Sequence, residues 1–159
     1  HTHSLFCPCC GAPTKRSAHI EKHCPSFNNL IYPPLAPATI TLVHKGKDEI
    51  LMVRAHNFRS NHYGLVAGFV EPGESLEECV SRELMEETRI RVKNIRYAGS
   101  QPWPFPCGIM IGFEADYESG EIIKQDSELI DAQWFNRHDL PPLPDGMSIA
   151  RQLIDKWLK

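Results

Sequence analysis

The chain lacks the features by which membrane proteins and nucleic-acid-binding proteins are usually recognised. No stretch approaches the roughly 20 apolar residues that a membrane-spanning helix needs, and no secretory signal is visible. There is no long run of lysine or arginine, and the formal net charge is −3. A protein that binds the phosphate backbone is usually more basic. We therefore expect neither a membrane nor a nucleic acid as the default partner.

The chain also lacks an initiating methionine, since its first residue is His1. It is therefore read as a processed chain or as part of a longer one. Its six cysteines include a Cys-x-x-Cys pair, which in a reducing compartment indicates metal or redox chemistry rather than a disulfide. The expected location is the cytoplasm, and a peroxisomal or mitochondrial location stays open if the chain is a fragment.

The length of 159 residues, with 42% hydrophobic residues, supports one ordinary domain and a small appendage. We place the appendage at residues 1–32 and the main domain at residues 33–159. Strands and helices that alternate along the main domain predict an α/β sandwich with a mixed sheet. The expected strands are residues 39–43, 49–54, 63–67, 92–100, 109–117 and 132–135, with 121–124 pairing a neighbour, and a terminal helix is expected at 148–158.

The segment from Gly68 to Ile90 carries the strongest chemical signal. Pro72-Gly73 predicts a turn, and Ser75 with Glu78 forms a capping-box pattern, so a helix should begin there and run to about Thr88. On a helical wheel, the stripe that holds Leu76, Cys79 and Val80 turns acidic one turn later. The acidic residues on that stripe are Glu83, Glu86 and Glu87.

Carboxylates on an inward helix face need a compensating charge. Burial of an unpaired carboxylate is costly, and neighbouring carboxylates repel each other. A hard divalent cation removes both costs, and oxygen ligands suit Mg²⁺ or Mn²⁺. The alternative is a solvated surface helix with an Arg82–Glu86 pair, but the ~0.2–0.5 kcal/mol of such a pair would not offset burial.

The same segment resembles the Nudix box. The match consists of Gly68, Glu74, and the run from Arg82 through Glu83, Glu86 and Glu87 to Ile90; the family has glycine where this chain has Arg89. The resemblance implies a Nudix α/β/α sandwich that hydrolyses a nucleoside diphosphate linked to another group, with two or more divalent metals on the diphosphate. A left-handed Arg89 would be strained, whereas a helical one would extend the helix; Arg89→Gly is expected to leave activity intact.

The resemblance also implies roles for individual residues. Glu83, Glu86 and Glu87 would hold metal, and Glu86 or Glu87 would also accept a proton from the attacking water. Arg82 would orient them, and Glu74 would steady Arg82. Glu128 matches a later acid linked to metal, although a solvated loop carboxylate explains it equally well. Cys79, His44, His56, His62 and His138 are expected to be structural or surface residues.

A second stretch, Ser100-Gln101-Pro102-Trp103-Pro104-Phe105-Pro106, lies between two expected strands. Alternate prolines keep it extended, so Trp103 and Phe105 share one side and can stack on bases; the alternative is that they cap the core. The stretch resembles the signature of the NADH pyrophosphatase subfamily, although Cys107-Gly108 departs from its continuation. That resemblance favours substrate binding, at the matching positions Tyr32, Phe69, Gln101, Trp103, Phe105 and Ala150.

Residues 1–32 contain an incomplete zinc ribbon, a module that the same subfamily carries. Cys7, Cys10 and Cys24 have the spacing of zinc ligands, but Phe27 stands where a fourth cysteine would complete the set. His19, His23 and Cys9 are possible substitutes. Our hypothesis is a weakly bound or absent zinc, with the module held by packing of three apolar side chains, which are Phe6, Phe27 and Leu30.

Together these patterns predict hydrolysis of the pyrophosphate bond of NADH, and more weakly of NAD⁺, to reduced nicotinamide mononucleotide or its oxidised form and AMP. The enzymatic alternatives are a broader nucleoside-diphosphate hydrolase, acting for example on ADP-ribose, and removal of NAD caps from RNA. The non-enzymatic alternative is a catalytically silent dinucleotide sensor. We also expect a homodimer.

Overall fold

The computed structural model describes residues 4–56, 58, 61–104 and 107–159. Its contacts divide the chain into two compact units, His1–Leu35 and Ala36–Lys159. This division falls close to the one expected after residue 32.

The N-terminal unit is a small antiparallel sheet with a cysteine turn. Its strands are β1 (Lys15–Arg16), β2 (Lys22–Cys24) and β3 (Asn29–Ile31), in the order β1-β2-β3. The amide of Gly11 donates to the carbonyl of Cys7 at 2.9 Å, and Gly11 has a φ of 71°, which closes a tight turn around the first cysteines. The side chains of Cys7 and Cys24 are buried in this unit.

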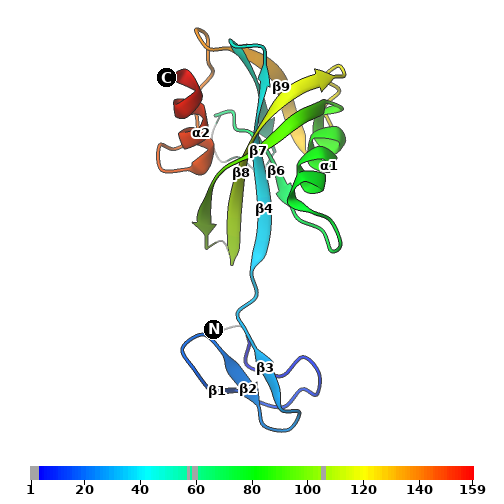
Figure 1. Cartoon of the computed structure of the whole chain (residues 1–159), viewed down its shortest axis with the longest axis vertical. Coiled ribbons are helices and arrows are strands. Elements are labelled where there is room, and N and C mark those ends of the chain that lie inside the picture. The colour runs from blue at the N-terminus through cyan, green and yellow to red at the C-terminus, as the bar shows by residue number, and fades with distance from the viewer. Residues whose placement is uncertain (1–3, 57, 59–60, 105–106) are drawn as a thin grey trace. The chain divides into compact units, whose positions relative to one another are not determined.

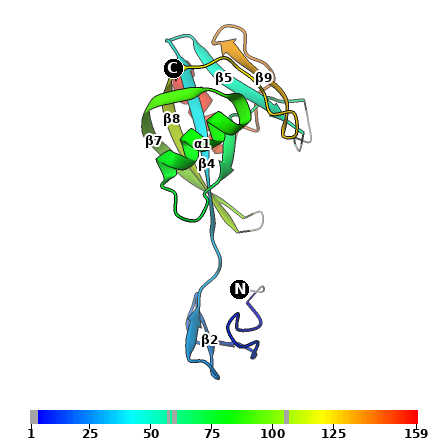
Figure 2. The ribbon, with the colours of Figure 1, turned by 90° about the vertical axis from the view of Figure 1, so that its right-hand side faces the viewer.

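The C-terminal unit is built on a six-stranded mixed sheet, seen in two orientations in Figures 1 and 2. The main path of the sheet runs β7-β8-β4-β5-β9, and β6 pairs with β4. Only the β4–β8 pair is parallel among the pairings of the described strands. The strands are β4 (Ala36–Lys45), β5 (Glu49–Ala55), β6 (Val66–Phe69), β7 (Arg91–Trp103), β8 (Gly108–Ser119) and β9 (Leu129–Asn136).

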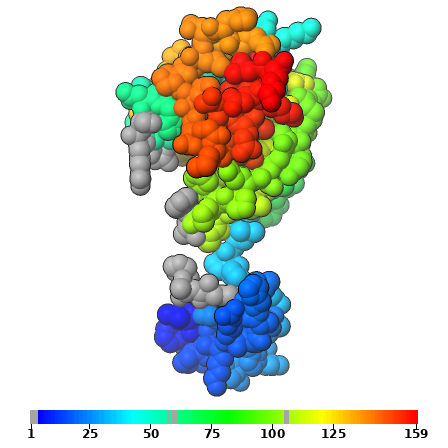
Figure 3. Space-filling view, turned by 90° about the vertical axis from the view of Figure 1, so that its left-hand side faces the viewer, coloured from blue at the N-terminus to red at the C-terminus, as the bar shows by residue number. Residues whose placement is uncertain are grey.

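Two helices cover opposite faces of this sheet. Because side chains alternate along a strand, neighbouring residues enter different layers. Leu51 and Val53 of β5 belong to the core beneath α1 (Leu76–Thr88), whereas Ile50 and Met52 belong to the core beneath α2 (Ile149–Leu158). Figure 3 shows α2 lying over its face of the unit. The predicted α/β sandwich with a mixed sheet is therefore confirmed.

The start of α1 is fixed by the predicted capping box. The Ser75 hydroxyl accepts a hydrogen bond from the Glu78 amide at 3.3 Å, and the Glu78 carboxylate accepts one from the Ser75 amide at 2.7 Å. The pair satisfies amides that have no partner within the helix, a contribution of about 1 kcal/mol for a good N-cap. It also fixes the rotation of α1 and hence which residues face the sheet.

The end of α1 is fixed by Arg89, which adopts the left-handed conformation with φ 61° and ψ 17°. Its amide donates to the carbonyl of Met85 at 3.2 Å, so the backbone turns where a glycine would turn without strain. Of the two conformations considered from the sequence, the strained one is therefore correct. A non-glycine residue in this region costs about 1–2 kcal/mol.

Two expectations about the strands need correction. Residues 121–124 form no strand; instead the amides of Ile123 and Gln125 donate to the carbonyls of Thr88 and Glu87, at 3.0 and 2.9 Å. These bonds satisfy carbonyls left open at the helix C-terminus. The strand expected at 63–67 begins later, at Val66, because Gly64 makes only an isolated bridge to Val53. Among the described helices, none has the length and apolar character to cross a membrane.

Candidate functional site

Arg82 supplies a positive charge within the segment from Gly68 to Ile90, where the sequence predicts the site. Its Nε and Nη2 donate to the two carboxylate oxygens of Glu74 at 3.0 and 2.7 Å, and Nη2 also donates to the carbonyl of Phe69 at 2.9 Å. This paired contact and the amide of Glu71 hold the pKa of Glu74 far below its usual value, at about 2. The loop before α1 is thereby joined to the helix.

The remaining nitrogen of Arg82 contacts two of the predicted metal ligands. Nη1 donates to Glu83 at 2.8 Å and to Glu86 at 3.1 Å. One guanidinium therefore orients both carboxylates from within the helix. These contacts match the orienting role that the family resemblance implies for Arg82 and the steadying role that it implies for Glu74.

Glu83 lies directly against the backbone of Gly68. A Cβ atom built on Gly68 would lie 1.8 Å from the carboxyl carbon of Glu83, closer than any real contact allows. Only glycine permits the β6 backbone to approach the helix so closely. Burial raises the pKa of Glu83 above its usual value, against the lowering effect of Arg82.

Glu87 is the most deeply buried acid of the site, with 6% of its surface exposed. Burial raises its pKa, and the nearby charges of Glu83, Glu128 and Glu86 act in the same direction, so that the pKa reaches about 8. Among the described residues, no donor forms a hydrogen bond with its carboxylate. A buried carboxylate in this condition is a strong candidate for a metal ligand.

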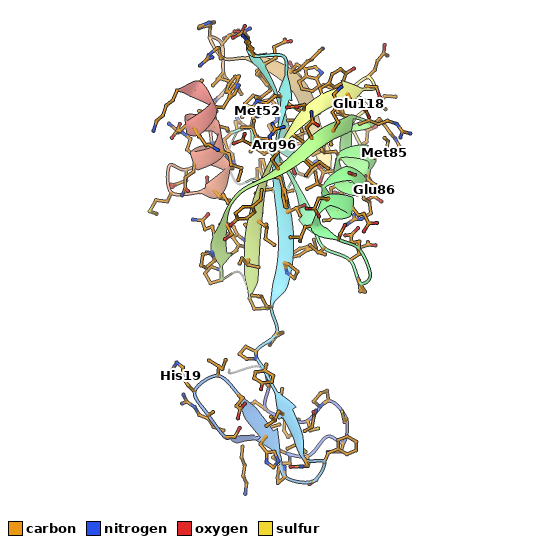
Figure 4. The ribbon with its side chains drawn as sticks, viewed as in Figure 1. His19, Met52, Met85, Glu86, Arg96 and Glu118 are labelled. Carbon is orange, nitrogen blue, oxygen red and sulfur yellow. The ribbon has the colours of Figure 1, made fainter. Side chains whose placement is uncertain are left out.

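Glu86 departs from the prediction that all three helix acids face inward. Its side chain is 54% exposed and projects from α1, as Figure 4 shows. The reason is its position at the edge of the helix stripe, next to the solvent-facing side. Among the described residues, the four acids also do not form a group as tight as the cysteines of the N-terminal unit. Glu83 and Glu86 meet on Arg82, whereas Glu87 and Glu128 meet at a pocket.

That pocket, which we call the acid pocket, has a volume of about 380 Å³. Glu128 reaches it from the loop after β8, and the loop is fixed by several backbone bonds. The amide of His56 donates to the carbonyl of Glu128 at 3.0 Å, and the ring Nε2 of His56 lies 3.1 Å from the carbonyl of Asp126. The pocket is lined by Val53, Ala55, His56, Phe58, Leu65, Ala67, Glu87, Ser127, Glu128 and Leu129.

His56 and Phe58 are site residues that sequence reasoning missed. His56 was expected to be structural or at the surface, and nothing in the spacing of histidines marked it. Its effect comes from holding the loop of Glu128 against the end of β5, which only the folded arrangement reveals. Phe58 lies in a polar stretch of sequence and lines the acid pocket as well as a second one.

The second pocket, which we call the apolar pocket, has a volume of about 240 Å³. It contains three of the positions matched to dinucleotide contacts, Gln101, Trp103 and Ala150. Phe58, Leu65 and Ala67 line both this pocket and the acid pocket, so the two adjoin. The other lining residues are Ile40, His62, Gly64, Met110, Pro144, Ser148 and Ile149.

Gln101, for which the resemblance implies a substrate contact, makes two hydrogen bonds within the protein. Its side-chain oxygen accepts from the amide of Ile149, and its side-chain nitrogen donates to the carbonyl of Met147, both at 2.8 Å. The amide group thus ties β7 to the first turn of α2. With one donor and its acceptor already engaged, Gln101 acts chiefly by positioning the wall that carries Ala150.

The other matched positions are Phe69, Tyr32 and Phe105. Phe69 is exposed at the end of β6 and lines neither of them. Tyr32 belongs to the N-terminal unit, where Glu21 raises its pKa through a hydrogen bond. Phe105 lies outside the described residues. Cys79 is buried, with its sulfur 3.3 Å from the Thr39 hydroxyl, as expected of a structural residue.

In the N-terminal unit, the sulfur atoms of Cys7, Cys10 and Cys24 lie within 4.8 Å of one another. Burial raises the pKa of Cys7, but the backbone amides of Cys9 and Cys10 outweigh it and lower the value to about 7. A thiolate is the form that binds zinc, so this favours ligation. The expected substitutes for a fourth ligand, His19, His23 and Cys9, are not part of the group.

The packing that we expected to hold this unit is absent. Phe6, Phe27 and Leu30 are all exposed rather than packed together as a core. The strands here are two or three residues long and cannot turn these side chains inward around a shared centre. The buried side chains of the unit include Cys7 and Cys24 instead, so its centre is the cysteine group.

Comparisons with known proteins agree with this geometry. A family model described as NUDIX domain matches residues 34–157. A relative from Pseudomonas syringae pv. syringae, named NAD-capped RNA hydrolase NudC, is 51% identical over 154 residues, covering 96% of this chain and 55% of the relative. A protein of the same name from Pseudomonas entomophila is 50% identical over 155 residues, with the same coverage. The chain thus spans about half the length of these curated relatives.

Solved structures show the same fold. The structure of a NUDIX hydrolase from Nitrosomonas europaea matches with a TM-score of 0.72 and 20% identity, covering 97% of this chain and 88% of that one. The NUDIX domain of Shewanella oneidensis NrtR, solved with ADP ribose, matches with a TM-score of 0.65 and 20% identity, covering 79% of this chain and 87% of that one. At these identities the likeness concerns the fold alone.

Proposed function

The chain belongs to the Nudix family, and we propose that it hydrolyses the pyrophosphate bond of NADH and NAD⁺ to nicotinamide mononucleotide, reduced or oxidised, and AMP. The observation that carries the proposal is the adjacency of two pockets of opposite character. The acid pocket suits the diphosphate with its cations, and the apolar pocket suits a base. A dinucleotide joined through a diphosphate has both parts.

The donor set fits divalent metal. The four carboxylates offer oxygen ligands, which suit Mg²⁺ or Mn²⁺, and Glu87 is buried without a donor among the described residues. The residues that would hold the ions are Glu83, Glu86, Glu87 and Glu128. Bound ions would neutralise the diphosphate and polarise its phosphorus atoms.

The residues of the chain then have distinct tasks. Arg82 keeps Glu83 and Glu86 oriented, and the His56 contacts hold Glu128 toward Glu87. Glu86 or Glu87 accepts the proton of the attacking water. Water adds to one phosphorus, the bond from that phosphorus to the bridging oxygen breaks, and the leaving phosphate keeps the bonding electrons.

A second candidate function is removal of NAD from the 5′ end of RNA. It is favoured by the relatives at 50% and 51% identity, which carry that activity in their names. The chemistry is the same, because the bond cleaved is the pyrophosphate of the NAD unit. The two substrates differ only in whether an RNA chain is attached to the adenosine.

The deciding experiment compares products. Purified protein is incubated with Mn²⁺ and, separately, NADH, ADP-ribose, a diadenosine polyphosphate and an NAD-capped oligonucleotide. Formation of AMP and reduced nicotinamide mononucleotide from NADH, faster than turnover of ADP-ribose, supports the proposal. Faster turnover of ADP-ribose would indicate the broader hydrolase, and turnover of no substrate would indicate the silent sensor.

For the N-terminal unit, we propose zinc bound by Cys7, Cys10 and Cys24. The support is the convergence of their sulfur atoms, together with the exposure of the side chains that would otherwise form a core. Elemental analysis after dialysis against EDTA tests it: about one zinc per chain is expected. A metal-free chain that keeps its folded near-ultraviolet spectrum would contradict it. A homodimer and a cytoplasmic location also remain proposals, which light scattering and cell fractionation test.

A further inference from the structure

A third pocket opens at the C-terminal end of α1 and shares Glu128 with the acid pocket. Its volume is about 450 Å³. Glu86 and Glu128 contribute acids to it, and Arg89 and Lys124 contribute cations. Ile123 and Gln125 complete the lining. We call it the cationic pocket, because it is where positive side chains meet the proposed metal ligands.

Backbone hydrogen bonds bring the segments that carry the two cations of this pocket together. The amides of Ile123 and Gln125 donate to the last carbonyls of α1, which brings the segment of Lys124 beside Arg89. Lys124 forms an ion pair with Asp126. Arg89 is exposed, and within the described part of the chain its guanidinium has no acceptor.

The backbone conformation of Arg89 is also energetically unfavourable. It occupies a left-handed position, φ 61°, that glycine would fill without strain. A strained residue at the edge of a site is a reason to look for a function of its side chain. The conformation directs attention to the guanidinium, which binds phosphate more readily than any other side-chain group.

The three pockets form a sequence. The apolar pocket shares Phe58, Leu65 and Ala67 with the acid pocket, and the acid pocket shares Glu128 with the cationic pocket. A substrate with its base in the first pocket and its diphosphate in the second would continue into the third. What it meets there are the side chains of Arg89 and Lys124, beside two acids that the proposed metal ions would neutralise. A pair of cations suits an anionic group and not a second apolar ring.

We propose that Arg89 and Lys124 bind a further phosphate, carried by the nucleoside beyond the diphosphate that is cleaved. This inference rests on the proposed function and adds a subsite to it. In an NAD-capped RNA that phosphate is the first internucleotide phosphate, and in NADPH it is the phosphate on the ribose. NADH has neither, so it uses the first two pockets alone.

The test measures kcat/KM for three substrates, which are NADH, NADPH and a short NAD-capped oligoribonucleotide. Arg89→Gln removes the charge and keeps the backbone strain, and Arg89→Lys restores the charge. We expect Arg89→Gln to lower kcat/KM for the capped RNA relative to NADH by roughly tenfold, as for loss of one charge-assisted hydrogen bond. The salt dependence for the RNA should weaken, by about 0.7 in the logarithmic slope for one phosphate contact on a single strand. Arg89→Lys should recover most of the loss.

Lys47→Gln is the matched control, because Lys47 is an exposed turn residue that lines none of the three pockets. It should leave the substrate ratio unchanged. A selective loss on capped RNA identifies the internucleotide phosphate as the ligand, and a selective loss on NADPH identifies the ribose phosphate. An equal effect of Arg89→Gln on all three substrates, or none, overturns the subsite.

The subsite and the proposed function fail in different ways. If the wild type hydrolyses none of the three substrates, the proposed function is wrong. Binding of labelled capped RNA, followed by fluorescence anisotropy, then still decides the subsite: equal affinity of the wild type and Arg89→Gln overturns it, and weaker binding of the variant supports it.

Discussion

The acid pocket and the apolar pocket adjoin, but they are assembled in different ways. The acid pocket takes its key carboxylates from one helix and one loop, and its charges are only partly compensated within the protein. Arg82 serves Glu83 and Glu86, whereas Glu87 has no such partner among the described residues. The apolar pocket takes its walls from strands and helices far apart in sequence. The comparison teaches that the helix acids are encoded locally, whereas Glu128 and the walls of both pockets are brought in by the whole fold.

The largest expected effect is a loss of kcat when a charge is removed from the proposed metal ligands. Glu87→Gln keeps the shape of the side chain and removes a buried ligand charge, so kcat should fall by two or more orders of magnitude, or about 3 kcal/mol of barrier. Glu86→Gln should act in the same direction. The losses should be similar on every substrate, because all share the diphosphate.

Glu77→Gln is the control for this pair, since Glu77 lies on the exposed side of the same helix. It should keep nearly full turnover. Circular dichroism should show that all three variants are folded. Near-normal turnover in both Glu86→Gln and Glu87→Gln would contradict metal-assisted catalysis by these acids.

The next largest effect distinguishes the role of the apolar pocket from that of the acid pocket. Trp103→Ala removes an aromatic surface from the apolar pocket, and base stacking on such a surface is worth about 1–3 kcal/mol, or roughly five- to hundredfold. We expect that loss in kcat/KM for NADH but not for a small phosphoanhydride without a base. Equal losses on both substrates would show that Trp103 merely supports the fold.

A smaller effect is expected from a change at Gln101, which shapes the apolar pocket and takes no part in the reaction. Gln101→Leu removes the hydrogen bonds to Ile149 and Met147 and frees the first turn of α2. KM for NADH should rise several-fold with little change in kcat, and the melting temperature should fall, because two net hydrogen bonds are worth about 1–3 kcal/mol. A fall in kcat with an unchanged KM would instead place Gln101 at the reacting atoms.

The last prediction is a pH dependence of folding stability that comes from Glu87 of the acid pocket. In metal-free protein the pKa of Glu87 is raised to about 8. Below the unfolded pKa the folded and unfolded chains both hold the proton. As the pH rises toward 8, the unfolded chain loses its proton first, so folding stability falls. We expect the melting temperature in EDTA to drop between about pH 5 and pH 8, and to drop less in Glu87→Gln. A wild-type profile parallel to that of the variant would contradict the assigned pKa.

Much of the segment from Gly68 to Ile90 could be predicted because its residues are close in sequence. The capping box and the end of the helix near Thr88 follow from spacing, and the structure agrees. The roles of Arg82 and Glu74 follow from the family resemblance and stay predictions, which the contact between the two side chains supports. The close approach of Gly68 to Glu83 could not be derived, because it depends on how β6 docks against α1. The exposure of Glu86 depends on a few tens of degrees of helix rotation, which a wheel cannot resolve.

The apolar pocket and the N-terminal unit were less predictable. The sequence shows that Trp103 belongs to a special stretch, but not that the Gln101 amide is used by α2 or that Phe58 joins the two pockets. The packed cluster of Phe6, Phe27 and Leu30 was wrong, because apolar residues in so short a sheet have no second layer to pack against. Only contacts distant in sequence decide these points.

The parallel pairing of β4 with β8 has a consequence for biosynthesis. Ala36 pairs with Gly108, and everything between them, including all of α1, is the connection that allows two strands to run side by side in one direction. Such long-range pairing forms slowly, because a large loop must close first. During translation, the helix acids emerge well before β8 and before Glu128. The nascent chain therefore carries its acidic helix without the strands and the loop that complete the candidate site, and the proposed cleavage of a diphosphate becomes possible only when the domain is nearly finished.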